Sequence, residues 1–117
     1  MYADSGPLAL RPQHGFLNYS TEAYTVIVVL VWDARKAAVN LKKHRVDFRE
    51  AATVLDDALS TTYPDVDHWE SEERYLTIGV SNRDRVLVVA HTEEDDRIRI
   101  ISARVATRRE RRFYEEG

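Results

Sequence analysis

The stretch Val26–Trp32 is a run of seven consecutive apolar residues, most of them β-branched. A helix that crosses a bilayer needs about 20 apolar residues, so this run is too short to span a membrane. β-Branched side chains in an unbroken apolar run are typical of a buried strand. We therefore predict a buried strand over Tyr24–Trp32, around which the rest of the chain must pack.

Two short helices are predicted after this strand. Asp33 can cap the first helix, which ends with the cations Lys42, Lys43 and His44. Its predicted inner stripe consists of Ala34, Ala37, Ala38 and Leu41. Asp47 can cap the second helix, and Glu50 is placed to complete a capping box with it. The predicted inner stripe of this second helix consists of Phe48, Ala51, Ala52 and Leu55.

Three strands are predicted after a short one near Leu59–Tyr63. They are Arg74–Val80, a strand carrying Val86, Val88 and Ala90, and a strand carrying Ile98 and Ile100. Thr107 and Glu110 form the S/T-x-x-E pattern of a capping box, so a last helix begins there. The main elements follow the order β-α-α-β-β-β-α, which predicts an α+β fold: an antiparallel sheet with helices packed on one face.

The first 22 residues show no apolar period and contain glycines and prolines. We interpret residues 1–22 as a mobile extension and residues 23–117 as a single domain. The sequence contains no cysteine, which excludes disulfides and thiolate metal sites and suits a reducing compartment. No secretory signal pattern is recognisable, so a cytoplasmic protein without membrane attachment is predicted.

Charge is distributed unevenly along the chain. The formal net charge of −3 argues against a nucleic-acid binder. Residues 56–73, however, contain seven acids and no lysine or arginine, whereas residues 97–117 contain seven arginines and three acids. The arginine-rich end could hold a phosphate or an acidic partner, or it could be a solvated helix.

The loop Asn82-Arg83-Asp84 is typical of a three-residue hairpin turn, with Asp84 in the left-handed conformation. It pairs Val80 with Val86 and Tyr75 with His91. If Ala90 then pairs with Ile100, the face opposite the apolar one gathers Tyr75, His91, Arg97 and Arg99. RNA cleavage through the 2′-hydroxyl needs a base, an acid and cations near the phosphate, and this set contains such groups. The alternative is a solvent-facing sheet with cross-strand ion pairs.

Three further clusters have functional and structural interpretations. In the functional interpretation, Lys43 and His44 together provide a proton donor and a phosphate contact. In the structural one, their positive charge only caps the C-terminal end of the helix. The acidic loop containing Asp65, Asp67, His68 and Glu70 matches no ordered metal-site spacing, so no metal or other cofactor is predicted. The arginines of the last helix spread around it, and Phe113 or Tyr114 is expected to anchor that helix.

Several motifs in combination resemble the BrnT toxin family, also described as DUF497. They are Val31-Trp32-Asp33 with Lys36, Asn40 and Lys43-His44, the segment Glu72-Glu73-Arg74-Tyr75, and the run Arg97-Ile98-Arg99-Ile100-Ile101-Ser102-Ala103-Arg104, followed by Thr107, Glu110 and Tyr114. The resemblance covers residues 31–117. Arg45 departs from the family, which often has glycine there, and the N-terminal extension is a second departure.

The resemblance implies a RelE-like fold and a ribonuclease that inhibits translation, as the toxin of a bacterial type II toxin–antitoxin pair. It also implies neutralisation by a ribbon-helix-helix antitoxin of the BrnA type. The toxin would be linked to DNA only indirectly, through this antitoxin. The candidate catalytic residues are Lys43, His44, His91, Arg99 and Arg104. The candidate substrate-binding residues are Tyr75, Arg74, Arg97, Arg108 and Tyr114, and Glu73 is a further candidate site residue. The resemblance does not say which of them transfers protons.

Two other functions stay open at this point. The chain could be a catalytically inactive module that acts only in an antitoxin complex that regulates its operon. It could also be an interaction domain unrelated to RNA. The retained arginines and histidines favour a ribonuclease over the inactive module.

Overall fold

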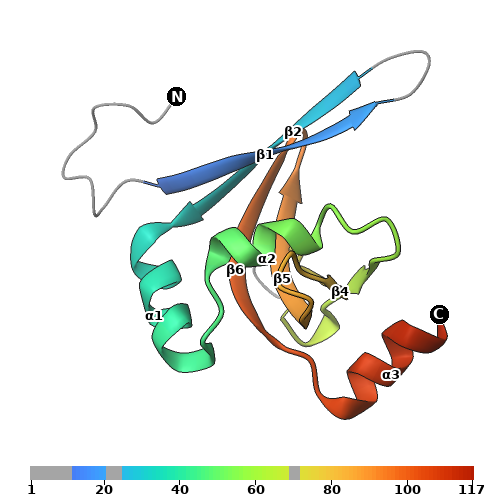
Figure 1. The fold of residues 1–117 in the computed structure, drawn as a ribbon. Coiled ribbons are helices and arrows are strands. Elements are labelled where there is room, and N and C mark those ends of the chain that lie inside the picture. Colours follow the sequence, from blue (N-terminus) through green and yellow to red (C-terminus); the bar gives the residue numbers. More distant parts are fainter. Residues whose placement is uncertain (1–11, 21–24, 69–71) are drawn as a thin grey trace.

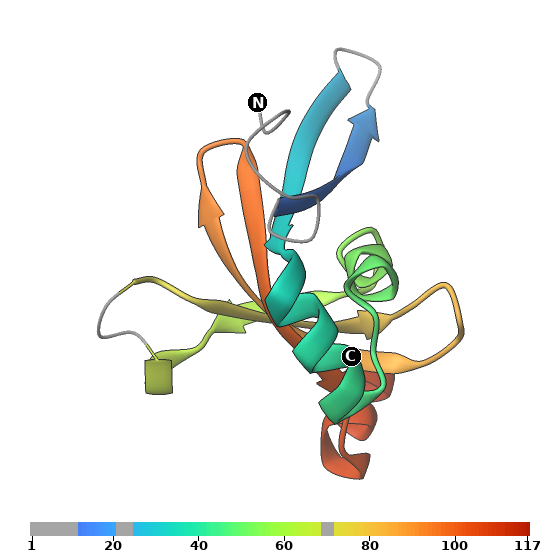
Figure 2. The same cartoon turned by 90° about the vertical axis from the view of Figure 1, so that its left-hand side faces the viewer.

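The computed structural model describes residues 12–20, 25–68 and 72–117. Six strands form one sheet in the order β1-β2-β6-β5-β4-β3, and three α-helices pack against it (Figures 1 and 2). The strands are β1 Pro12–Ser20, β2 Thr25–Asp33, β3 Thr61–Pro64, β4 Tyr75–Val80, β5 Val86–Glu94 and β6 Arg97–Val105. The helices are α1 Ala34–His44, α2 Phe48–Val54 and α3 Arg108–Glu116, with a short 3-10 turn over Val66–His68. The α+β class is therefore confirmed.

The sheet is mixed, so the prediction of an antiparallel sheet is wrong at one strand pair. β2 runs parallel to β6 through Val29–Val31, while all other neighbouring strands are antiparallel. β2 leads into α1 and α2, and the chain then builds β3, β4 and β5 before β6 returns beside β2. This long crossover is what makes β2 and β6 parallel.

Helices cover both faces of the sheet, where one face was predicted. Val89 belongs to a core with Phe48 and Ala51 of α2, whereas Val88, the preceding residue, belongs to a second cluster with Tyr114 of α3. Consecutive residues of a strand point to opposite faces, so α2 and α3 lie on opposite sides. In Figure 1, α3 accordingly lies apart from α1 and α2, after the end of β6.

Residues 12–20 form strand β1, although the sequence places them in a mobile extension. β1 pairs with β2 along its whole length, from Pro12 opposite Asp33 to Ser20 opposite Thr25. A strand without an apolar period can still form when a neighbouring strand offers it a complete hydrogen-bonding edge. The rest of the predicted extension, residues 1–11 and 21–22, lies outside the described residues.

The hairpin between β4 and β5 has the predicted register. Val80 pairs with Val86 and Tyr75 with His91, and Asp84 has a positive φ of 59°. The next hairpin differs, because its turn consists of the two residues Asp95 and Asp96, with φ of 52° at Asp95. The turn is one residue shorter than the predicted pairing of Ala90 with Ile100 requires, because Glu94 pairs with Arg97.

A β-bulge in β6 shifts the register once more. Ala90 pairs with Ser102 while His91 pairs with Ile100, so Ile101 has no partner on β5. An extra residue reverses the alternation of side chains along a strand. Arg104 therefore lies on the same face as Arg97 and Arg99, and the predicted pairing of Ala90 with Ile100 is wrong.

Candidate active site

Helix α1 carries Lys43 and His44 in its last turn. The helix begins at Ala34 because the Asp33 carboxylate accepts hydrogen bonds from the Arg35 amide at 2.7 Å and the Lys36 amide at 3.4 Å. It ends where Arg45 takes the left-handed conformation. The basic residues of the last turn lie near the negative end of the helix dipole, as the sequence predicted.

Asn40 fixes α1 against β6, and it replaces Leu41 in the predicted inner stripe. Its side-chain nitrogen donates to the Ala103 carbonyl at 2.8 Å and the Val46 carbonyl at 3.0 Å, and its oxygen accepts from the Ala103 amide at 3.0 Å. Leu41 is 47% exposed. The buried position of α1 is thus polar, because the backbone of β6 beside it needs hydrogen-bonding partners.

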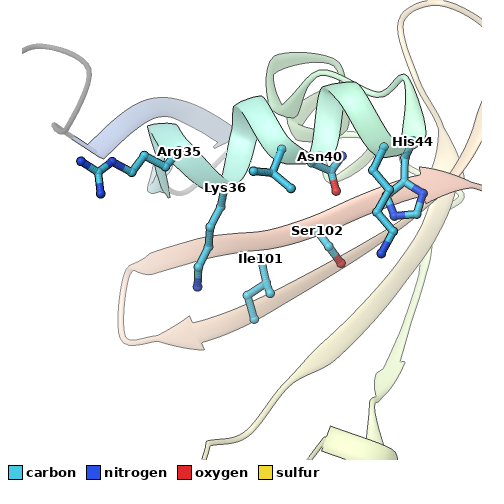
Figure 3. A pocket seen from close by; sticks show the side chains of 8 residues that line it. Arg35, Lys36, Asn40, His44, Ile101 and Ser102 are labelled. Atoms are coloured by element: carbon cyan, nitrogen blue, oxygen red, sulfur yellow. The ribbon is translucent and has the colours of Figure 1, made fainter.

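A groove of about 320 Å³ separates α1 from β6. Its helix side carries Arg35, Lys36, Val39, Asn40, Lys43 and His44, and its strand side carries Ile101 and Ser102. Figure 3 shows Lys36 and His44 extending from α1 toward β6. The bulge at Ile101 lies at this groove, so the irregular part of β6 forms one of its walls.

The groove combines positive charge with an imidazole side chain. Arg35, Lys36 and Lys43 are exposed, and His44 is half-buried. Lysine and arginine side chains that project into a groove attract phosphate groups. A histidine beside them can act as a general acid or base in catalysis. The groove is therefore suited to bind a phosphodiester and to transfer protons to or from it.

The structure does not bring His91 to this groove. His91 is buried, and its Nε2 lies 2.7 Å from the Thr77 hydroxyl. Burial lowers the pKa of His91 to about 4, so the ring is neutral at pH 7. Among the described residues Nδ1 finds no well-formed hydrogen bond, although the Thr92 backbone lies close to it.

The predicted set of Tyr75, His91, Arg97 and Arg99 is divided between the two faces of the sheet. His91 pairs with Ile100, which places both on the α2 face, whereas Arg97 and Arg99 have the opposite parity. Tyr75 stays with His91: their rings are stacked with centroids 6.1 Å apart, and the Tyr75 hydroxyl donates to Glu73 at 3.2 Å. The altered register of β5 and β6 is the physical cause of this division.

Three of the predicted arginines, Arg74, Arg99 and Arg104, contact carboxylates. Arg99 donates to Glu72 at 2.8 Å, and Arg74 lies 3.5 Å from the same carboxylate. Arg104 donates through both terminal nitrogens to Glu110, at 2.7 and 2.8 Å. The bond to Arg104 lowers the pKa of Glu110 to about 2 and raises that of Arg104. These guanidinium groups must leave a carboxylate, or share it, before they can contact a phosphate.

Helix α3 holds the last two predicted residues. Arg108 is exposed in its first turn, next to the capping box that Thr107 forms with Glu110. Tyr114 packs against the second cluster and donates its hydroxyl to Asp57 at 2.6 Å, which raises its pKa to about 12. Tyr114 is thus an anchor of α3, as predicted for Phe113 or Tyr114.

Sequence reasoning missed Arg35, Lys36 and Ser102 as members of the groove. One signal was present, because Lys36 and Lys43 are seven positions apart and so lie on one face of a helix. No comparable signal identifies Ser102, which reaches the groove through the bulge and the packing of α1.

No group of three His, Asp or Glu side chains within the described residues is arranged to hold a metal ion. In the acidic loop the His68 ring lies 3.0 Å from Asp65, and Glu70 lies outside the described residues. No helix in the part of the chain that the structure describes is long and apolar enough to cross a membrane.

Comparisons with known proteins point to one family. The sequence model of the BrnT family, described as the ribonuclease toxin of type II toxin–antitoxin systems, matches residues 32–110 of the chain. Among solved structures, the chain is similar to the crystal structure of the Brucella abortus ribonuclease toxin BrnT, with a TM-score of 0.52 and 24% sequence identity. This similarity covers 66% of the present chain and 94% of the Brucella chain, and it shows a shared fold. No curated protein matches the chain.

Proposed function

The chain belongs to the BrnT family, the ribonuclease toxins of type II toxin–antitoxin systems, and we propose that it cleaves RNA in the groove between α1 and β6 without a metal ion. The observation that carries the proposal is that Arg35, Lys36, Lys43 and His44 line one groove. In this proposal, cleavage of RNA inhibits translation, and side-chain cations take the place of the metal ion that other nucleases use.

The groove provides the groups that cleavage through the 2′-hydroxyl requires. His44 accepts the proton of the 2′-hydroxyl, whose oxygen then attacks the phosphorus atom. The bond from phosphorus to the 5′-oxygen breaks and leaves a cyclic phosphate, and the ammonium group of Lys43 donates a proton to the departing 5′-oxygen. Arg35 and Lys36 stabilise the negative charge that develops on the phosphate oxygens. His44 suits proton transfer better than His91, because His91 is 1% exposed and cannot reach a bound phosphodiester.

Arg97, Arg99 and Arg104 have a secondary place in this proposal. They share one face of the sheet, and Arg99 and Arg104 are held by Glu72 and Glu110. When RNA reaches this face, its phosphates replace the carboxylates as partners of these guanidinium groups. Arg74 and Arg108 bind the RNA backbone in the same way. Tyr75 offers an aromatic ring on which a base can stack.

We further propose that a ribbon-helix-helix antitoxin of the BrnA type neutralises the chain in the cytoplasm. The family name implies an antitoxin, and the positive groove suits an acidic segment as well as it suits RNA. The antitoxin, rather than the toxin, would contact DNA.

The experiment compares RNA cleavage by the wild-type chain, His44→Gln, Lys43→Ala and the control Lys42→Ala. Loss of a proton-transfer group or of a phosphate contact lowers the cleavage rate roughly 100-fold or more. Lys42 is exposed on the same helical turn but does not line the groove, so its variant should cleave at the wild-type rate. All reactions are repeated in EDTA, where wild-type cleavage should continue.

Three results would contradict the proposal. Equal cleavage by His44→Gln and wild type would place the chemistry elsewhere. Loss of activity in EDTA that magnesium restores would show that a metal is required. A folded wild-type chain that binds an antitoxin but leaves RNA intact would favour the inactive module.

A further inference from the structure

A second pocket lies on the α2 face of the sheet, away from the groove. It has a volume of about 290 Å³ and lies between the segment that follows α2 and strands β3 to β6. Its polar lining consists of Asp57, Ser60, Thr62, Thr77, His91 and Glu93. Leu55 and Ile98 add apolar walls. Sites for small ligands are close to this size and combine apolar walls with a few convergent polar groups.

The floor of the pocket is a chain of hydrogen-bonded side chains. The Thr62 and Thr77 hydroxyls lie 2.6 Å apart, and the Thr77 hydroxyl lies 2.7 Å from Nε2 of His91. Each hydroxyl can act as donor or acceptor, so the direction of the chain can reverse to suit a ligand. Burial of His91 and its stacking on Tyr75 hold the ring in place.

The charges of the lining select the class of ligand. Asp57 and Glu93 are acidic, and none of the described lining residues is a lysine or an arginine. Both carboxylates repel a phosphate. Asp57 already accepts hydrogen bonds from Leu59, Val80 and Tyr114, so Glu93 is the carboxylate that can accept one from an amino group of a ligand. Apolar walls with hydroxyls and carboxylates suit a flat ring whose faces are apolar and whose edge donates hydrogen bonds.

We propose that this pocket binds a nucleobase that carries an exocyclic amino group: adenine, cytosine or guanine. The inference rests on the proposed function insofar as the base belongs to the RNA substrate. The phosphodiester would lie in the positive groove and the base in this acidic pocket, so the two sites divide the recognition of RNA between them. Ile98 and Ser102, one from each site, are four residues apart on β6, which is about 13 Å along a strand.

Binding is measured by NMR titration of the ¹⁵N-labelled full chain with adenosine, cytidine, guanosine and uridine. At least one amino-bearing nucleoside should shift the amides of Thr77, His91 and Glu93. Uridine, which lacks the amino group, should bind at least about tenfold more weakly. Nucleosides carry no phosphate, so the groove contributes nothing to this signal.

Two pairs of variants locate the binding. Ala58 lines the pocket and the neighbouring Leu59 does not, so Ala58→Trp should abolish the shifts and Leu59→Trp should retain them. Thr77→Val removes a hydroxyl from the pocket, whereas Thr92→Val removes a buried hydroxyl outside its lining. The first should weaken nucleoside binding about tenfold and the second should not.

The outcomes separate this inference from the proposed function. Three results would each overturn the proposal that this pocket binds an amino-bearing base. They are the absence of amide shifts with every nucleoside, binding of uridine as tight as that of the amino-bearing nucleosides, and wild-type binding by folded Ala58→Trp. None of these bears on cleavage in the groove. Nucleoside binding by a chain that never cleaves RNA would contradict the proposed function and leave the pocket intact.

Discussion

Arg45 ends α1 in a backbone conformation that suits glycine. Its φ of 60° and ψ of 31° lie in the left-handed region, where an L-residue with a Cβ atom is strained. Glycine, which the family resemblance implies at this position, adopts this conformation without strain. The Arg45 carbonyl also accepts a hydrogen bond from Arg85 at 3.1 Å, so the turn is held from outside the helix.

Arg45→Gly should stabilise the fold by about 1 kcal/mol, since glycine adopts this conformation without strain. The carbonyl that binds Arg85 is backbone and is retained. Urea denaturation measures the change, with Lys42→Gly as control. Lys42 lies in the helix, so glycine there should destabilise by about 1 kcal/mol. A lower midpoint for Arg45→Gly would show that the arginine side chain contributes more than the backbone strain costs.

Glu110 makes stability depend on pH at the acidic end. Its pKa falls from the usual 4.5 to about 2, mainly because Arg104 donates to it. A carboxyl whose pKa is lowered by folding stabilises the protein above its unfolded pKa and ceases to do so as the pH falls through the folded value. The contribution is therefore complete at pH 7 and disappears between about pH 4.5 and pH 2.

Glu110→Gln should lower the unfolding free energy by about 1–2 kcal/mol at pH 7, since both a charged hydrogen bond and a helix cap are weakened at a partly exposed site. The difference from the wild type should shrink as the pH falls toward 2. Thermal unfolding followed between pH 7 and pH 2.5 tests this, with the exposed Glu115→Gln as control. A difference that is independent of pH would refute the assignment to the ionised carboxylate.

At the scale of elements, α1 is joined to the sheet by one polar side chain. Asn40 makes three hydrogen bonds to the backbone of Val46 and Ala103, and Ala103 belongs to the part of β6 that follows its three-residue pairing with β2. The side chain satisfies backbone groups that would otherwise be buried without partners. It therefore also sets the width of the groove between α1 and β6.

Asn40→Ala should destabilise the fold by about 2–4 kcal/mol, because it leaves buried backbone groups unpaired. Leu41→Ala should change stability by less than about 1 kcal/mol, as Leu41 is 47% exposed. Denaturation of both variants decides between the polar anchor and the apolar stripe expected from the sequence. A larger loss of stability in Leu41→Ala than in Asn40→Ala would contradict the polar anchor and support the predicted apolar stripe.

At the scale of the molecule, β1 covers the edge of β2. The two strands pair over nine residues, whereas β2 pairs with β6 over three. In Figures 1 and 2 the C-terminal end of β1 and the N-terminal end of β2 project beyond the other strands. The family match begins at residue 32, after β1 and most of β2.

Deletion of residues 1–20 should leave a folded chain that still cleaves RNA, since the family match lies wholly outside the deleted segment. It should also expose the edge of β2, and an unpaired, apolar edge strand promotes self-association. Size-exclusion chromatography with light scattering measures the association. Deletion of residues 1–11 keeps β1 and serves as the matched control. An unfolded product of the longer deletion would show that β1 belongs to the domain.

The sequence by itself determined the features that depend on near neighbours. Asp33, Asp47 and Thr107 cap their helices because a cap needs a side chain and amides two or three residues away. The hairpin from β4 to β5 has the expected register because a three-residue turn fixes it locally. The family resemblance likewise rests on residues in short runs, and the family match confirms it.

The tertiary structure alone decided what depends on distant partners. Glu50, expected to complete the cap of α2, is buried instead and bonds Ser81 and Arg85, which lie more than 30 positions away. The parallel pairing of β2 with β6 joins segments that no local pattern relates. The bulge at Ile101 likewise has no local signal in the sequence. A change of one residue in strand register moves every following side chain to the other face. The two-residue turn Asp95-Asp96 places His91 on the face opposite Arg97 and Arg99. The bulge and the packing of α1 against β6 place Ser102 in the groove with Lys43 and His44.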